Sequence, residues 1–184
     1  MFRRFAVLLA AAAAVAMVII FLTEWAVEAA GAETQVMIRA IAKDAMVIGT
    51  KVGGARITVR DLATGAILAQ GIQEGTSGNV DLIMKQPGIR GVNVFDAPGT
   101  AGFLAKLALE TPTEVVVTAE GPLGSPESLQ QSSKTLLLVP GQDVLGDGII
   151  LELNGFIVKL LSPGPEAQPV SAGSLKVRAT VHML

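Results

Sequence analysis

The sequence from residue 33 onward predicts an all-β protein, a single antiparallel β-sandwich. Its apolar runs are short, rich in valine and isoleucine, and separated by glycine, proline and asparagine turns, as in sheet proteins built of many short strands. No segment in this part of the sequence combines a helical apolar stripe with a capping residue and a stop signal. About nine or ten strands at this spacing indicate two packed antiparallel sheets.

The expected strands follow one another with turn signals between them. Residues 35–48 form one long strand or two strands joined at residues 43–44. Residues 55–60 alternate, with Ile57 and Val59 facing inward and the polar side chains outward. The other expected strands cover residues 66–70, 80–85, 91–95, 102–109, 114–119, 149–153, 156–161 and 175–183.

The connections between these strands have their own signals. Asn154 and Gly155 separate two apolar runs, so we expect a two-residue hairpin with a positive φ at Gly155. Residues 121–133 are rich in serine and glutamine and contain two prolines, which predicts a surface loop. Residues 162–173 contain three prolines and form a second expected loop.

One segment carries a family resemblance. Residues 54–71, GARITVRDLATGAILAQG, are followed by GTSG at residues 75–78. The segment resembles the start of a transthyretin-like domain, the fold also seen in carboxypeptidase regulatory-like modules. The resemblance implies a transthyretin-like or Ig-like sandwich that serves as a binding or structural module without catalysis. The hallmarks of immunoglobulin domains themselves are absent, because the chain contains neither cysteine nor tyrosine.

The N-terminal segment is typical of a secretory signal peptide. Arg3 and Arg4 precede an unbroken apolar run over residues 5–22, and Ala30-Gly31-Ala32 follows as a small-residue cleavage site. We therefore expect a signal peptide over residues 1–32 and one β-sandwich domain over residues 33–184. The protein would be exported to the periplasm or the cell exterior.

An uncleaved membrane anchor is the alternative for the same segment. The apolar run of 18 residues is long enough to cross a bilayer core as a helix. Trp25 lies three residues after its end, at the level where aromatic residues anchor membrane helices. Both interpretations place everything after Trp25 outside the cytoplasm.

Composition argues against a nucleic acid partner and against disulfides as a source of stability. The formal net charge is −2, and lysines and arginines form no cluster, so a nucleic acid partner is not expected. The chain has no cysteine, although an exported protein could form disulfides. Stability must therefore come from burial and backbone hydrogen bonds.

Catalytic groups are sparse. His182, the single histidine, lies near the end of the last expected strand, and nothing nearby in the sequence supplies a nucleophile or an orienting carboxylate. A cysteine nucleophile is absent, and a serine triad would need that same histidine. We therefore expect neither an enzyme nor a cofactor.

Metal binding has three weak candidates, Asp143, Asp147 and His182. Residues 143–154 match a calcium loop at its first, fifth and sixth positions, but leucine and asparagine replace the ligands at the third and twelfth. Copper would use His182 with Met183, whose side chains lie on opposite faces of a strand. We therefore assign no metal site from the sequence.

The most unusual property of the chain is that several strands are apolar on both faces. In residues 156–161, Phe156, Val158 and Leu160 share one face, and the other carries Ile157, Lys159 and Leu161. Such a strand is either covered by another element or presents an apolar patch to a partner. We expect Ile157, Lys159 and Leu161 to form an interaction surface, because a lysine fits the rim of a patch better than a closed core.

These patterns together predict an exported, non-catalytic binding or structural protein of the cell envelope. It would bind a protein partner or a second copy through an apolar sheet face, close to the membrane if the anchor is retained. Two other classes stay open: a small periplasmic protein that binds copper or calcium, and a membrane-anchored accessory subunit of a larger envelope complex.

Overall fold

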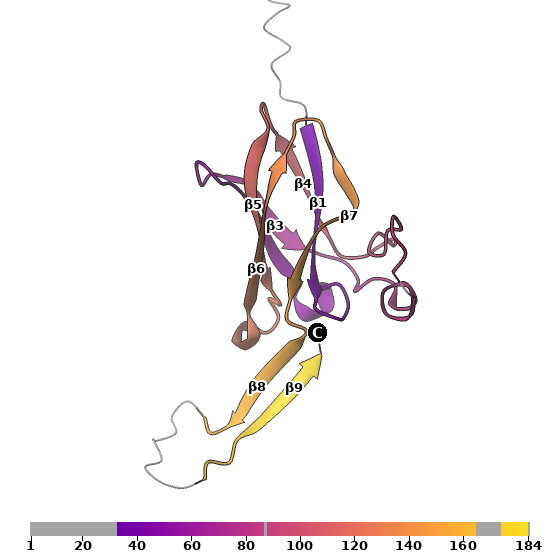
Figure 1. Ribbon diagram of the computed structural model, residues 1–184. Helices are drawn as coiled ribbons and strands as arrows, with labels where there is room; N and C mark the ends of the chain where they lie inside the picture. Colours follow the sequence, from indigo (N-terminus) through magenta and orange to yellow (C-terminus); the bar gives the residue numbers. More distant parts are fainter. Residues whose placement is uncertain (1–32, 87, 165–173, 184) are drawn as a thin grey trace, which may run out of the picture.

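The computed structural model describes residues 33–86, 88–164 and 174–183, which form two packed sheets and a projecting ribbon (Figure 1). One sheet has the strand order β4-β1-β7, the other β3-β2-β5-β6, and β8 pairs with β9 alone. The strands of these residues are β1 (Glu33–Ala42), β2 (Ala55–Asp61), β3 (Ile67–Gln73), β4 (Phe103–Ala108), β5 (Thr113–Gly121), β6 (Gln130–Leu138), β7 (Val144–Leu153), β8 (Phe156–Ser162) and β9 (Arg178–Met183). Short helical turns are η1 (Thr50–Val52), η2 (Asp81–Lys85) and η3 (Pro126–Ser128).

The all-β architecture with packed sheets follows the sequence prediction, but the sheets are not purely antiparallel. β1 pairs with β4 antiparallel and with β7 parallel. β7 enters this sheet from β6 in the opposite sheet through the short connection at residues 139–143. This crossing between layers, rather than a hairpin, sets the direction of β7.

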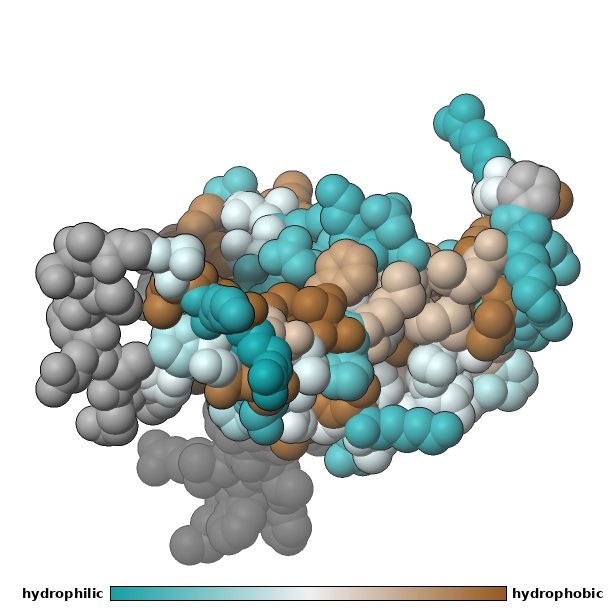
Figure 2. Space-filling model, turned by 90° about the horizontal axis from the view of Figure 1, so that it is seen from below, coloured by the Kyte–Doolittle hydropathy of each residue, from teal (hydrophilic) through white to brown (hydrophobic). Residues whose placement is uncertain are grey.

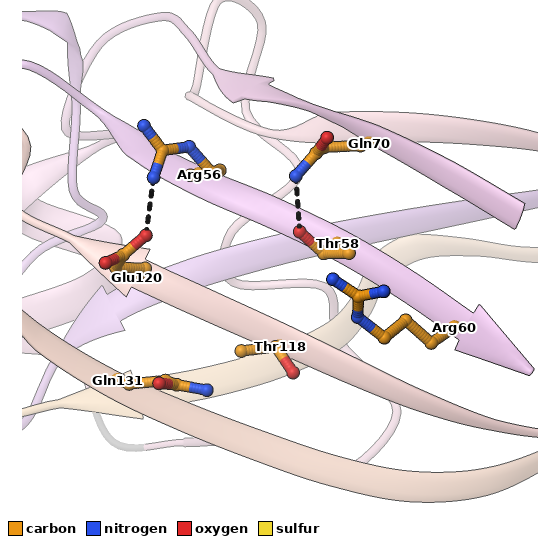
Figure 3. Close-up of a pocket in the computed structure, with 7 residues that line it drawn as sticks. All are labelled: Arg56, Thr58, Arg60, Gln70, Thr118, Glu120 and Gln131. Carbon is orange, nitrogen blue, oxygen red and sulfur yellow. Dashed lines mark hydrogen bonds and ion pairs between the residues drawn. The ribbon is translucent and has the colours of Figure 1, made fainter. Parts of the chain in front are cut away.

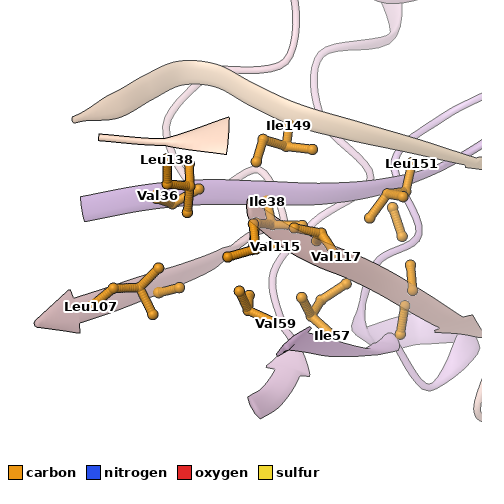
Figure 4. Close-up of a cluster of buried hydrophobic side chains, with 14 of the residues drawn as sticks. Val36, Ile38, Ile57, Val59, Leu107, Val115, Val117, Leu138, Ile149 and Leu151 are labelled. Atoms are coloured by element: carbon orange, nitrogen blue, oxygen red, sulfur yellow. The ribbon is translucent and has the colours of Figure 1, made fainter. Parts of the chain in front are cut away.

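The core lies between the two sheets (Figure 4). Ile57 and Val59 of β2 are fully buried, as the alternation in residues 55–60 predicts. Val115 and Val117 of β5 lie beside them, and Ile38 of β1 reaches the same cluster from the opposite sheet. β4 and β5 bury every second side chain, which is the pattern of sheets with one covered face.

Of the two alternatives for residues 35–48, the structure shows the one with a break at residues 43–44. β1 ends at Ala42, the chain turns, and Ile41 then forms an isolated antiparallel bridge with Val47. Lys43 donates its backbone N–H to the carbonyl of Leu153 at 2.7 Å, which ties this turn to the end of β7.

Two predicted strands are wrong. Residues 80–85 contain the helical turn η2, and residues 91–95 are irregular. The side chain of Asn79 accepts the backbone N–H of Leu82 at 3.1 Å, and Lys85 pairs with Asp81 one turn earlier. An asparagine cap and an i,i+4 ion pair are helix signals, and they outweigh the strand propensity of this exposed segment.

The surface loop predicted over residues 121–133 is wrong in its second half, where β6 begins at Gln130. The first residues of β6 are polar because they lie opposite polar residues of β5. Gln131 pairs with Glu120, and Ser133 pairs with Thr118. A polar composition therefore concealed a strand at the solvated edge of a sheet.

The hairpin predicted at Asn154 and Gly155 is also wrong. β7 and β8 do not pair, and Gly155 has no positive φ. The backbone N–H of Asn154 donates to the side chain of Gln130 at 2.7 Å. A Cβ at position 155 would lie 2.8 Å from the carbonyl oxygen of Lys43. The glycine thus permits a close approach between two backbone segments instead of a tight turn.

The predicted export segment, with its cleavage site and its alternative role as an anchor, lies outside the described residues. Within the described ranges, no helix is long and apolar enough to cross a membrane.

Candidate binding surface

The β8–β9 ribbon projects from one end of the packed sheets, and β8 contacts the rest of the molecule mainly at η3 (Figure 1). Residues paired across two antiparallel strands lie on the same face. The register therefore assigns the side chains of the ribbon, apart from the bulge at Leu161 and Ser162, to one of two faces. We call the first the apolar face; it comprises Phe156, Val158, Leu160, Ala179, Val181 and Met183. We call the second the basic face; it comprises Ile157, Lys159, Arg178, Thr180 and His182.

In the part of the chain that the structure describes, the side chains of the apolar face are exposed. Its five large side chains, Phe156, Val158, Leu160, Val181 and Met183, are 53 to 63% exposed. Figure 2 views the molecule from the end at which the ribbon projects, and it shows brown, apolar side chains gathered there next to teal ones. A two-stranded ribbon is marginal in water by itself, and apolar patches of this kind mark interaction sites.

The sequence prediction placed the interaction surface at Ile157, Lys159 and Leu161. In the structure Ile157 is half-buried, Lys159 is exposed, and Leu161 is the extra residue of a bulge in β8. The larger apolar surface lies on the opposite side of the ribbon. It could not be found from β8 alone, because half of it comes from β9, whose pairing with β8 replaces the expected hairpin with β7.

The two edges of the ribbon differ. Ser128 of η3 covers the outer edge of β8: its Oγ accepts the N–H of Val158 at 3.2 Å and lies 3.3 Å from the carbonyl of that residue. The N–H and carbonyl of Val158 point away from β9. In an antiparallel pair the N–H and carbonyl of the opposite residue, Val181, then point away from β8 as well. Among the described strands, none pairs with this outer edge of β9.

A shallow groove of about 370 Å³ lies between η3 and the base of the apolar face. Phe156 and Val158 form its apolar wall. The opposite wall is mostly polar and includes Leu129, and Glu127 is the charged residue among the described residues that line it. Apolar and acidic groups thus meet where the ribbon leaves the sheets.

The three candidate metal ligands do not come together. Asp147 accepts the backbone N–H groups of Val94 and Phe95 at 2.8 and 2.7 Å, one with each carboxylate oxygen. Asp143 accepts the N–H of Gln35 at 2.7 Å, and His182 lies on the ribbon. The described part of the chain contains no group of three His, Cys, Asp or Glu residues placed to hold a metal ion.

The calcium-like sequence around Asp147 forms a bulge in β7. The register moves by two residues in β1, from Val36 to Ile38, while it moves by five in β7, from Val144 to Ile149. Gly146 and Gly148 adopt φ values of 68° and 70° on either side of Asp147. Such a bulge favours glycines, which adopt positive φ, and the aspartate between them bonds to the neighbouring backbone. These same residue types produce the resemblance of the segment to a calcium loop.

Arg39 completes this bulge from β1. Its side chain is 3% exposed and donates to the carbonyl groups of Gly146 and Asp147 and to the carboxylate of Asp96, the last at 3.1 Å. Arg39 and Asp147 together attach the long connection between β3 and β4 to the sheet. The carboxylate of Asp147 therefore makes hydrogen bonds within the fold, which accounts for an acidic residue that the sequence marks as a metal candidate.

A second concave surface lies on the outer face of the four-stranded sheet and has a volume of about 300 Å³ (Figure 3). Arg56 pairs with Glu120 at 2.7 Å, and Gln70 donates to the hydroxyl of Thr58 at 3.1 Å. Their polar groups bond to one another across the strands, as on a solvated sheet face. The ribbon is therefore the stronger candidate for a binding surface.

No family model, curated protein or solved structure matches this chain.

Proposed function

We propose that this chain is an exported, non-catalytic binding or structural protein of the cell envelope, and that it acts through the apolar face of the β8–β9 ribbon. The observation that supports this most directly is the exposure of five large apolar side chains on one face of that ribbon. Burial of apolar surface against a partner stabilises a complex by about 25 cal/mol per Å² of area removed from water, before the costs of association.

The contrast within the molecule strengthens the proposal. The inner faces of the two large sheets are closed, with Ile38, Ile57 and Leu151 each at most 2% exposed. The same residue types on the ribbon remain half exposed. A chain that closes one core this completely, yet leaves a second apolar surface open, has a surface suited to a partner.

The resemblance of residues 54–78 to a transthyretin-like module belongs to this proposal. The segment contains β2, the turn that follows it and β3. In that turn Asp61 accepts the backbone N–H of Thr64 at 2.7 Å, and Gly65 adopts a φ of 73°. A module of this type would act by binding or as a structural element.

Export enters the proposal through the N-terminal segment. The expected cleavage site, Ala30-Gly31-Ala32, directly precedes Glu33. A cut at that site would retain all of the residues that the structure describes.

The test is photo-crosslinking in the exporting cell. A photoreactive amino acid at Val181 reports on the apolar face, and the same residue at Thr64 reports on an exposed turn at a distance from the ribbon. We expect a discrete protein adduct from position 181 and none from position 64. Identical adduct patterns from the two positions, or no adduct at all, would refute the proposed surface.

A further inference from the structure

The apolar face of the ribbon fits a second copy of itself. Its six side chains include no polar or charged group, and flat apolar sheet faces pack against each other at a spacing of about 10 Å. We infer that two copies of this chain associate ribbon to ribbon, apolar face against apolar face. This inference rests on the proposed function, since it names the partner of the same surface.

The basic face argues for a copy over a lipid surface. Lys159, Arg178 and His182 lie on the side of the ribbon opposite to the apolar face. In a segment that lies on an anionic bilayer, basic groups sit beside the apolar ones at the level of the headgroups. In a pair of stacked ribbons, by contrast, the basic faces of both copies stay in water on the two outer sides.

Charge also selects the partner. Residues 33–155 contain nine lysines and arginines against thirteen acidic residues, whereas residues 156–184 contain three basic residues and one acidic residue. The ribbon of one copy is therefore attracted to the acidic body of another. Complementary charge steers association and suppresses wrong orientations.

The same charges orient the two ribbons base to tip. Lys176 lies at the tip, just before β9, whereas Glu127 lines the groove at the base. A two-fold axis across the strands places β8 of one copy over β8 of the other and brings each basic tip to an acidic base. The ribbon projects beyond the packed sheets (Figure 1), so this arrangement leaves the two bodies at opposite ends without collision.

The chain offers a clean test because it contains no cysteine of its own. In the base-to-tip pair Val158 lies near the two-fold axis and faces its counterpart, while the neighbouring Lys159 points away. Because facing sheets lie about 10 Å apart, beyond the reach of a direct disulfide, we expect a short bis-maleimide crosslinker to join the full chain with Val158→Cys into a dimer, seen on a denaturing gel. Lys159→Cys, one residue along on the other face, should remain monomeric.

A charge exchange tests the orientation. Glu127→Lys in the Val158→Cys background should reduce the dimer yield, because both ends of the ribbon then carry the same charge. Lys176→Glu added to Glu127→Lys should restore it. Recovery by this second change distinguishes a charge contact from a folding defect; absence of recovery overturns the base-to-tip arrangement.

Equal dimer yields from positions 158 and 159 would overturn self-association. The proposed function can survive that result, because the photo-crosslink at position 181 would then contain a different protein. If position 181 gives no adduct either, both proposals fail. The two experiments thus separate the identity of the partner from the existence of the surface.

Discussion

The buried side chain of Gln73 and the backbone of Ala40 form two hydrogen bonds in opposite directions. The Oε1 atom of Gln73 accepts the N–H of Ala40 at 2.7 Å, and its Nε2 donates to the carbonyl of Ala40 at 2.9 Å. Nε2 also donates to the carbonyl of Ile48 at 2.8 Å. Because Gln73 ends β3 and Ala40 lies in β1, these bonds join the two sheets at one corner of the core.

We predict that Gln73→Leu destabilises the fold although leucine fills a similar volume. The change removes the Gln73 partner of the buried N–H of Ala40 and of the carbonyl of Ile48, whereas the carbonyl of Ala40 keeps the N–H of Ile48. Each buried group left unsatisfied costs about 1–3 kcal/mol. Gln70→Leu on the exposed outer face of β3 serves as the control and should have a small effect. Denaturant unfolding measures both, and equal midpoints for the two variants would contradict the assigned role of Gln73.

Asp147 gives the second prediction. Its two oxygens accept the N–H groups of Val94 and Phe95, so Asp147→Ala should destabilise the protein by about 2 kcal/mol through the loss of two charge-assisted hydrogen bonds. Since these bonds are internal, we expect the thermal midpoint of the wild type to be the same with added calcium and with a chelator. A midpoint that rises with calcium would instead support the calcium-binding alternative.

Residue patterns predicted the layers of this fold better than its connections. The alternation around Ile57 and Val59 reports burial directly, because every second side chain of a half-covered strand faces the core. The direction of β7 and the pairing of β9 depend on contacts between distant segments, which local spacing does not contain. Asn154 and Gly155 illustrate the failure: their types suit a hairpin, but the nearby backbone of Lys43 uses the glycine for close packing.

The candidate surface could be predicted only in part, because half of it depends on the pairing of two distant segments. The apolar character of residues 156–161 is visible in the sequence, and the structure confirms that Leu160 and Leu161 are exposed. Which face forms the larger patch depends on β9, because Val181 and Met183 extend one side of β8 and leave the other basic. No pattern within β8 contains that information.

Gly155 gives a prediction that separates two explanations for a glycine at this position, a hairpin turn and a close approach of two backbone segments. In a two-residue hairpin turn asparagine would be tolerated at this position, because asparagine adopts positive φ more readily than other residues. In the structure any Cβ would lie 2.8 Å from the carbonyl oxygen of Lys43, so we expect Gly155→Asn and Gly155→Ala to destabilise the protein alike. A wild-type unfolding midpoint for Gly155→Asn would restore the hairpin.

Asp61 makes stability depend on acid pH. The hydrogen bond from the backbone of Thr64 lowers the pKa of the Asp61 carboxyl. A group whose pKa is lower in the folded state contributes stability that is present above its unfolded pKa of about 3.9 and is lost as the pH falls through the folded value. Asp61→Asn should therefore flatten the decline of the thermal midpoint below about pH 4. Parallel pH profiles for the variant and the wild type would show that Asp61 contributes nothing to it.

The last prediction concerns the N-terminus of the protein after the proposed export. Ala30-Gly31-Ala32 has the small residues that signal peptidase requires, and it directly precedes Glu33. We expect the mature chain to begin at Glu33 and to fractionate with the soluble envelope contents. Intact-mass measurement decides this, with Ala30→Leu and Ala32→Leu together as the matched variant in which cleavage is blocked. A wild-type protein found in membranes with residues 5–22 still attached would favour the anchored accessory subunit. In that case the ribbon would still lie at the end of the domain opposite to the start of β1 (Figure 1), so the apolar face would remain open to a second copy.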